Sequence, residues 1–303
     1  MVGSANTDLV ARVPYYPEIG SCLTGSAFDV FFGGKGSNQA VAAARLGADV
    51  AVVVRLGDDA FGREYLANYA RERIDITHVV IDPVLHSGVA LIIVEDRTGR
   101  NTIAYTPNSN GALGPADVRA GASAIVSADA LVTQLEVPVE ATLEAFRIAR
   151  GAGERRPRII LNAAPFPLMA LPDELLSSVD LLIVNEEEAA YFSGRAVASA
   201  DQAMAASVEL AARSRAVAVT LGAAGVVICE AGSEPVYVPA RQVRAVDTTG
   251  AGDAFVGSLA YLLAGGATLT EAAPRAVEIA TRTVLRAGAQ SSFPRRDEVA
   301  DLL

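Results

Sequence analysis

The segment best suited to chemistry is a glycine-rich turn that carries an acidic residue, Asp247-Thr248-Thr249-Gly250-Ala251-Gly252-Asp253-Ala254-Phe255. It lies between an apolar stretch and a helical pattern. Backbone N–H groups at such a helix start converge with about half a unit of positive charge, which would bind an anion. Asp253 would be repelled by that anion and is better suited to accept a proton from a hydroxyl that attacks phosphorus. The spacing also fits an ordinary helix start with Asp247 or Thr249 as the N-cap.

A second glycine-rich turn opens another helical pattern and holds the only lysine of the chain, Phe32-Gly33-Gly34-Lys35-Gly36-Ser37-Asn38-Gln39-Ala40. Glycines let a ligand approach the backbone, and Lys35 offers a compact charge with several donors. A tight turn with a solvated lysine is the alternative. Because Lys35 is followed by Gly36, the turn is not a Walker A loop, and a protein kinase would need a further lysine on a strand. The chain also has no G-x-S-x-G hydrolase motif.

Polar side chains follow two predicted strands in places where a sugar could bind. Asn6 and Asp8 are two residues apart, so an extended backbone turns both toward the same face, although a polar turn fits equally well. Glu136 comes just after a buried strand, at the carboxyl edge where open α/β sheets hold ligands, or it is a solvated loop residue.

Two further turns suggest contacts with a nucleotide and its metal ion. The first turn is Asn185-Glu186-Glu187-Glu188, whose spacing is typical of a capping box at a helix start. Alternatively, Glu188 helps to organise Mg²⁺ through water. The turn Thr220-Leu221-Gly222-Ala223-Ala224-Gly225 suits either a nucleotide contact or a hairpin.

The elements that must position these residues alternate between strands and helices. Because the strands are nearly continuous apolar runs, they should be buried on both faces of a parallel sheet. The pattern predicts an α/β fold with a central, mostly parallel sheet flanked by helices. Helices are expected at 37–46, 59–72, 115–126, 138–151, 198–213, 251–264 and 269–286, and strands at 49–55, 130–134, 158–162, 179–184 and 216–220.

Two regions break this alternation and indicate β-structure outside the main sheet. They cover about 9–32 and 79–106, the second with a turn at 95–100. A small sheet buries little surface alone, so we expect it to form a lid over the main domain and to contact another subunit. The whole chain, 1–303, is then one domain with a β lid. Met1–Ser4 is expected to be the end of a shortened first strand.

Composition excludes several classes of protein. The chain has 303 residues, 51% of them hydrophobic, and a net charge of -10, which argues against a disordered chain or a nucleic-acid binder. No apolar run is long enough to span a membrane, and no secretory signal is present. Two cysteines and two histidines offer little for disulfides or zinc, so a reducing cytoplasm is the expected compartment.

Taken together and in this order, these segments resemble the ribokinase family of sugar kinases, also called the PfkB carbohydrate kinases. The resemblance extends from Gly3 to about Pro294 and includes both family signatures, Gly33–Ala43 and Asp247–Phe255. It implies a ribokinase-like fold and MgATP-dependent phosphorylation of a primary hydroxyl, with Asp253 as the catalytic base. The amides of Gly250, Ala251 and Gly252 would form the anion hole.

The resemblance also implies a set of binding residues. D-ribose, phosphorylated at O5, would be held by Asn6, Asp8, Gly34, Lys35, Asn38, Glu136 and Asp253; ATP by Asn185, Thr220, Gly222, Gly225 and Gly252; and Mg²⁺ by Glu188 through water. A monovalent cation, K⁺, would lie beside Asp247, Thr249, Thr283, Arg286, Gly288 and Ser292, mostly on backbone carbonyls. A homodimer through the β lid is implied as well.

Other functions remain open from the sequence. The acceptor could be deoxyribose, fructose or a nucleoside, although the polar set Asn6, Asp8, Asn38 and Glu136 favours a hydroxyl-rich sugar over an apolar base. A catalytically silent sugar sensor is a third hypothesis. The retained Asp253 and the glycines beside it argue against this hypothesis.

Overall fold

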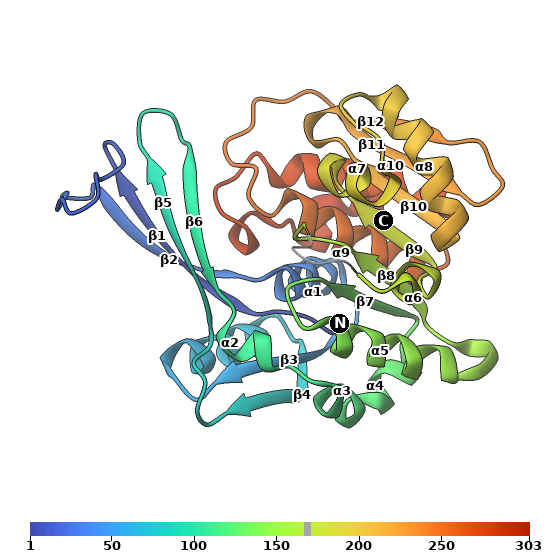
Figure 1. Ribbon diagram of the computed structural model, residues 1–303, viewed down its shortest axis with the longest axis horizontal. Helices are drawn as coiled ribbons and strands as arrows, with labels where there is room; N and C mark the ends of the chain where they lie inside the picture. Colours follow the sequence, from blue (N-terminus) through green and yellow to red (C-terminus); the bar gives the residue numbers. More distant parts are fainter. Residues whose placement is uncertain (167–170) are drawn as a thin grey trace.

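The body of the molecule is a β-sheet with helices on both faces, in a computed structural model that describes residues 1–166 and 171–303 (Figure 1). Six strands lie in the order β12-β11-β10-β9-β8-β7. Strands β7 to β10 are parallel, whereas β11 and β12 are antiparallel to their neighbours. Their bounds are β7 Ala130–Gln134, β8 Arg158–Asn162, β9 Leu181–Val184, β10 Ala216–Thr220, β11 Gly225–Glu230 and β12 Val236–Pro239.

The N-terminal residues join a second pair of strands to this sheet. Strands β3 (Ala51–Gly57) and β4 (Asp75–Asp82) are parallel partners. Val2 forms parallel bridges to Val53 in β3 and to Thr133 in β7. The amide of Val2 donates to the carbonyl of Val132 at 3.1 Å. The first residues therefore lie as a short strand-like segment between β3 and β7, as expected from their position in the sequence.

Helices cover the two faces of the sheet and bury separate apolar cores. One face packs on α9 (Ala251–Ala264) and α10 (Leu269–Thr283), and the other on α5 (Val139–Gly151) and α8 (Ala200–Ser214). Burial on both faces explains why these strands read as continuous apolar runs. The remaining helices are α1 Lys35–Leu46, α2 Ala60–Arg71, α3 Pro115–Ala120, α4 Ala122–Ser127, α6 Asp173–Ser177 and α7 Glu186–Ser193.

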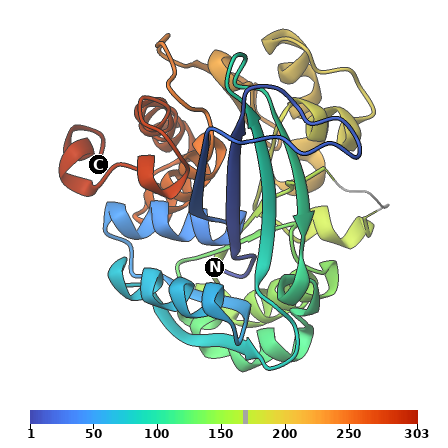
Figure 2. The same cartoon turned by 90° about the vertical axis from the view of Figure 1, so that its left-hand side faces the viewer.

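A second sheet stands apart from the body and has the order β2-β1-β5-β6. Figures 1 and 2 show its strands leaving the α/β body side by side. The bounds are β1 Asn6–Val13, β2 Ala27–Gly33, β5 Gly88–Glu95 and β6 Asn101–Thr106. Asn6 and Asp8 lie within β1, so strand alternation turns both toward one face of this lid sheet.

Three element predictions need correction. Residues 79–82 belong to β4 and not to the lid, because they pair in parallel with residues 54–57 of β3. After the strand, the Asp82 side chain accepts from the amides of Val84 and Leu85, which turns the chain. The helix expected over 115–126 is broken at Gly121, where a Cβ would lie 2.7 Å from Val53 Cγ2. The last helix ends at Thr283 and not at residue 286.

No helix within residues 1–166 and 171–303 is both long and apolar enough to cross a membrane.

The contact between α1 and α9 is close because Gly257 of α9 has no side chain. A Cβ there would lie 2.5 Å from the carbonyl oxygen of Gln39 and 2.7 Å from Cβ of Ala42. Both helices begin at the glycine-rich turns, so this contact fixes the distance between the two turns.

We predict that Gly257→Ala lowers the free energy of unfolding by about 1–3 kcal/mol, because the added methyl overpacks this crossing. Gly151→Ala is the matched control, since nothing lies within 4 Å of its added Cβ, and it should leave stability unchanged or raise it by up to about 1 kcal/mol, because alanine favours a helix more than glycine does. Urea denaturation of both variants provides the measurement. Equal effects would show that the crossing tolerates a methyl group.

Candidate active site

The two glycine-rich turns meet because they open two helices that pack against each other. Asp253 lies in the first turn of α9, and Asn38 and Gln39 lie in the first turns of α1. The Asp253 carboxylate accepts from both amides: Nδ2 of Asn38 donates to Oδ2 at 2.9 Å, and Nε2 of Gln39 donates to Oδ1 at 3.0 Å. The carboxylate is buried, and each of its oxygens has a fixed partner.

Gln39 belongs to a longer row of buried amides. Its Nε2 also donates to Oδ1 of Asn162 at 2.9 Å, and its Oε1 accepts from Nε2 of Gln134 at 2.7 Å. Gln39 is fully buried. Since a buried amide with partners at both ends cannot turn without losing them, this row holds Asp253 from the side of the central sheet.

Positive backbone angles at two glycines let the turns approach their neighbours. Gly34 has φ +84°, and a Cβ there would lie 2.7 Å from the amide nitrogen of Asn6. Gly250 has φ +77°, and its Cβ would lie 2.9 Å from Cα of Ala289. By contrast, nothing lies within 4 Å of a Cβ added to Gly252, so open space borders the backbone at this residue. The Ala251 amide donates to the carbonyl of Thr248 at 3.2 Å.

The polar residues expected to bind a sugar lie around the glycine-rich turn that opens α1. Asp8 lies against Gly33, whose added Cβ would meet the Asp8 carboxylate oxygens within 2.4 Å. Glu136 accepts from the hydroxyl of Ser4 and, at 2.9 Å, from the backbone amide of Lys35. Oδ1 of Asn6 accepts from Nδ2 of Asn110 at 2.6 Å.

The charged groups around the start of α1 shift one another's pKa values. Burial lowers the pKa of the Lys35 ammonium, but the carboxylates of Asp253, Glu136 and Glu188 outweigh it, so the pKa is raised. Burial, followed by the charges of Glu136 and Asp253, raises the pKa of Asp8 to about 7. The site therefore gathers more carboxylates than cations, which suits a ligand that donates hydrogen bonds through its hydroxyls.

The residues expected to bind a nucleotide lie at the carboxyl ends of two neighbouring parallel strands. Oδ1 of Asn185 accepts from the Glu188 amide at 2.8 Å, and Oε2 of Glu188 accepts from the Asn185 amide at 2.9 Å, which is the capping box expected from the sequence. The hydroxyl of Thr220 donates to the carbonyl of Val184 at 3.2 Å. Gly222 and Gly225 form the turn of the β10–β11 hairpin.

Glu188 is the carboxylate whose chemistry suits Mg²⁺. Burial raises its pKa to about 7, against the opposing effects of the Asn185 amide and of Lys35. The described part of the chain offers no group of three or more His, Cys, Asp or Glu side chains that could hold a metal ion. Since Mg²⁺ keeps much of its water and uses one or two carboxylates with phosphate oxygens, a single buried carboxylate beside the nucleotide residues fits it.

Asp247 joins the two loops expected to surround a monovalent cation. Its Oδ1 accepts from the amide and hydroxyl of Thr249 at 2.9 and 2.7 Å, and its Oδ2 accepts from the Gly288 amide at 2.8 Å. These hydrogen bonds outweigh burial and lower the pKa of Asp247. Asp247 is thus a carboxylate of lowered pKa whose hydrogen bonds link the two loops.

The other residues of that set use their side chains elsewhere. The hydroxyls of Thr283 and Ser292 donate to the carbonyls of Ile279 and Ala289. The guanidinium of Arg286 pairs with Glu298. Only backbone carbonyls at these positions are therefore suited to a cation.

The structure also brings residues to the site that the sequence did not single out, namely Ser4, Gln39, Tyr105, Asn110 and Gln290. The Tyr105 hydroxyl bonds with the side chains of Asn6 and Asn110, and burial raises the pKa of Tyr105 well above its ordinary range. Gln39 could have been found, because it follows Asn38 in the same first turns of a helix. Asn110 and Gln290 carry no local signal, since only the tertiary fold places them here.

Comparisons with known proteins agree with this geometry. The family model described as pfkB family carbohydrate kinase matches residues 1–296. The ribokinase of Haemophilus influenzae is 38% identical over 304 residues, covering 100% of this chain and 97% of that protein, and the ribokinase of mouse (Mus musculus) is 37% identical over 303 residues, covering 99% and 92%. The chain belongs to the pfkB family of carbohydrate kinases, and its ribokinase-like α/β fold is confirmed.

Two further comparisons bear on the substrate. A deoxyribokinase of Salmonella typhi is 33% identical over 304 residues, covering 100% of this chain and 97% of that protein. The structure of Arabidopsis thaliana ribokinase complexed with ribose and ATP superposes with a TM-score of 0.89 at 27% identity, covering 99% of this chain and 96% of that one.

The raised pKa of Asp8 predicts a pH-dependent cost in stability. Between its ordinary value of 3.8 and about 7, the native protein binds a proton that the unfolded chain has lost, so this group destabilises the fold increasingly as the pH rises through that window. We predict that Asp8→Asn, a neutral side chain of similar shape, raises the melting temperature more at pH 8 than at pH 4.

Differential scanning fluorimetry of both proteins at the two pH values measures this difference. Asp29→Asn is the matched control, because Asp29 is an exposed residue on the neighbouring strand of the same sheet. The same gain for Asp8→Asn at both pH values would contradict the raised pKa.

Proposed function

We propose that this protein is an ATP-dependent ribokinase, which transfers the γ-phosphoryl group of ATP to O5 of D-ribose and forms ribose 5-phosphate. The observation that carries the proposal is the Asp253 carboxylate, which Asn38 and Gln39 hold at the start of α9. Full-length similarity to proteins named ribokinase supports the same activity.

Ribose would bind between the lid and the two turns. The acceptor set comprises Asn6, Asp8, Gly34, Lys35, Asn38, Glu136 and Asp253, which approach one another from β1, the first turn of α1, the loop after β7 and the start of α9. Carboxylates would accept hydrogen bonds from sugar hydroxyls, and Lys35 and Asn38 would donate. Such a dense polar set rejects ligands that leave its members unpaired.

In this proposal Asp253 acts as the general base. As the O5–phosphorus bond forms, the carboxylate accepts the O5 proton, and the bond from the γ-phosphorus to the bridging oxygen of ADP breaks. Phosphoryl transfer needs alignment and charge stabilisation more than covalent help from the protein. The backbone N–H groups of Gly250, Ala251 and Gly252 would stabilise the transferring group, with the Ala251 amide first releasing Thr248.

The nucleotide would lie along the ends of β9 and β10, against Asn185, Thr220, Gly222, Gly225 and, at its phosphate end, Gly252. Mg²⁺ bound with ATP supplies charge neutralisation on the phosphates, and Glu188 would hold it through water. Asp247 and Thr249, with backbone groups at Thr283, Arg286, Gly288 and Ser292, would hold K⁺ beside the anion hole. Asp247 is the residue that best supports this cation site, because it already links both loops.

Deoxyribose is the alternative acceptor that a specific observation favours, since a deoxyribokinase is also a full-length relative. Fructose stays an alternative acceptor, whereas nucleosides are less favoured, because Asn6, Asp8 and the other polar acceptor residues suit a hydroxyl-rich sugar better than an apolar base. A silent sugar sensor would not need a base held by two amide donors.

We further propose that residues 1–303 act as one domain, whose lid contributes to a homodimer. Leu9 faces Val30 and Leu91 across the strands, on the side of the lid opposite to Asp8, and these side chains form an apolar row. Val30 and Leu91 are exposed to solvent in the single chain.

The exposed thiol of Cys22 is unpaired, which favours a reducing cytoplasm as the location.

We predict that Asp253→Ala lowers kcat by at least about 10²- to 10⁴-fold, the usual contribution of a general base, with ribose affinity nearly intact. Stopped-time assays give kcat, and isothermal titration calorimetry gives the ribose Kd. Asp8→Ala should show the opposite pattern, with a higher ribose Kd as its main effect and a smaller change in kcat. Near-normal turnover in Asp253→Ala would remove the base assignment.

A coupled ADP-release assay tests the proposed activity itself. With MgATP, with and without K⁺, we expect kcat/KM to be highest for D-ribose among ribose, 2-deoxyribose, fructose and a nucleoside panel. A higher value for deoxyribose would reassign the enzyme, and no ADP release with any acceptor would revive the sensor hypothesis.

We predict that light scattering gives about twice the chain mass of 31.3 kDa, and that Leu91→Asp returns it to the mass of a single chain. A charge in the apolar row cannot be buried without a large cost. Val236→Asp is the control, because Val236 is also an exposed apolar residue but lies on β12, away from the lid. A wild-type protein of single-chain mass would overturn the dimer.

A further inference from the structure

The side-chain amide of Asn38 lies between two polar partners, one of which needs its NH₂ group as a donor and the other its oxygen as an acceptor. Its Nδ2 donates to Oδ2 of Asp253 at 2.9 Å, whereas its Oδ1 accepts from Nε2 of Gln290 at 3.0 Å. A half-turn of the amide would bring its carbonyl oxygen against the carboxylate and its NH₂ against another NH₂. Gln290 therefore selects the one orientation of Asn38 in which it donates to Asp253.

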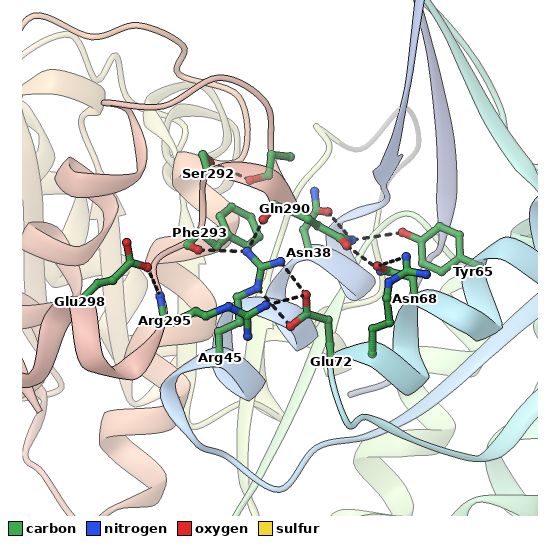
Figure 3. Close-up of polar contacts among 12 residues, drawn as sticks. Asn38, Arg45, Tyr65, Asn68, Glu72, Gln290, Ser292, Phe293, Arg295 and Glu298 are labelled. Carbon is green, nitrogen blue, oxygen red and sulfur yellow. Dashed lines mark hydrogen bonds and ion pairs between the residues drawn. The ribbon is translucent and has the colours of Figure 1, made fainter.

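Gln290 is itself held in one orientation. Its Oε1 accepts from Nδ2 of Asn68 at 2.9 Å, and Oδ1 of Asn68 accepts from Nη2 of Arg71 at 3.1 Å. Figure 3 shows Asn68, Gln290 and Asn38 in succession, with Tyr65 beside them. Every donor in the series Arg71, Asn68, Gln290 and Asn38 points the same way, from a guanidinium toward the Asp253 carboxylate. Hydrogen bonds aligned in this manner polarise and strengthen one another.

The amides of this series are buried, so each of them depends on its neighbours to keep its orientation. Asn38, Asn68 and Gln290 are each no more than 6% exposed. Water cannot readily replace a lost partner at such depth, so removal of one amide leaves its neighbours with unsatisfied groups. The neighbouring side chains would then rotate to find other partners. Asn38 is the member of the series that contacts Asp253, so its rotation would affect the carboxylate directly.

The backbone that carries Gln290 is also anchored. Nη1 of Arg45 donates to the carbonyl oxygens of Gln290 and Phe293, the latter at 3.0 Å, while the same guanidinium pairs with both carboxylate oxygens of Glu72 (Figure 3). Arg45 belongs to α1 and Glu72 follows α2. The segment after α10 is thus fixed to the helix that carries Asn38, and Gln290 reaches Asn38 from a defined position.

We propose that Gln290 is a positioning residue for phosphoryl transfer, which sets the orientation of the Asn38 amide and through it that of the Asp253 carboxylate. This inference rests on the proposed function and goes beyond it, because Gln290 touches neither the sugar nor the nucleotide in that proposal. The nucleotide residues lie at the ends of β9 and β10, outside the hydrogen-bonded series.

The test is a pair of substitutions that alter Gln290 differently. Gln290→Glu keeps the size and the acceptor for Asn68 but removes the donor to Asn38, and Gln290→Leu removes both. We expect kcat/KM for the sugar to fall about 10- to 100-fold in both variants, through a higher KM and a lower kcat, since a small misplacement at a reacting centre has effects of this size. The KM for ATP should change less than twofold.

Gln202→Glu is the matched control, because Gln202 is an exposed glutamine on α8 whose side chain contacts only the Ala198 amide among the hydrogen bonds of the described residues. Its kinetics should equal those of the wild type. Asn68→Leu tests the series without touching Asn38. If Gln290 and Asn68 act as one unit, the double variant Asn68→Leu/Gln290→Leu will lose no more kcat/KM than Gln290→Leu alone.

Four outcomes would overturn the proposal: wild-type sugar kinetics in both Gln290 variants, a lower melting temperature with unchanged kinetic constants per folded molecule, an equal rise of both KM values, or fully additive losses in the double variant. Gln290→Met replaces the leucine variant if the latter does not fold. Failure of the proposed function is distinguishable, because the wild type would then release no ADP. Ribose titration by calorimetry would in that case still report on Gln290, whose variants should bind the sugar more weakly.

Discussion

A buried carboxylate with an amide donor on each oxygen is the constraint on which the rest of this structure depends. An ionised Asp253 beneath the surface would be costly without partners, and Asn38 and Gln39 supply them. The two donors also fix the direction in which the carboxylate points. Because they come from α1 and the carboxylate comes from α9, the site exists only while these helices keep their contact at Gly257.

The fold meets this requirement by anchoring both helix starts to other parts of the chain. Gly34 and Gly250 let the two turns lie directly against the backbone at Asn6 and Ala289. The lid strand β1 brings Asp8 over the same point, so the sugar residues and the base converge from segments more than 200 residues apart in the sequence. An excess of carboxylates around Lys35 follows from this convergence. It raises the pKa of Lys35 against the effect of burial, and it adds to burial in raising the pKa of Asp8.

Much of this could be predicted from the sequence, because the signals were local. Apolar runs and glycine-rich turns gave the α/β sheet, the lid and the positions of Asn38 and Asp253. The predicted helix boundaries were wrong where a tertiary contact determines the end of the helix. At Gly121, for example, the close approach of Val53 accompanies a break between α3 and α4. Partners such as Asn110 and Gln290 could not be predicted, since an isolated Asn or Gln has no periodicity or motif that marks it as buried beside a distant carboxylate.

The most direct test of the central claim is a crystal structure with ribose and a non-hydrolysable ATP analogue. The proposed mechanism predicts that an Asp253 oxygen lies about 2.6–3.2 Å from O5 of the sugar, with the hydrogen bonds from Asn38 and Gln39 still present and the start of α9 facing the γ-phosphate. A sugar whose primary hydroxyl lies beyond reach of that carboxylate, or a carboxylate turned away from it, would contradict the assignment of Asp253 as the base.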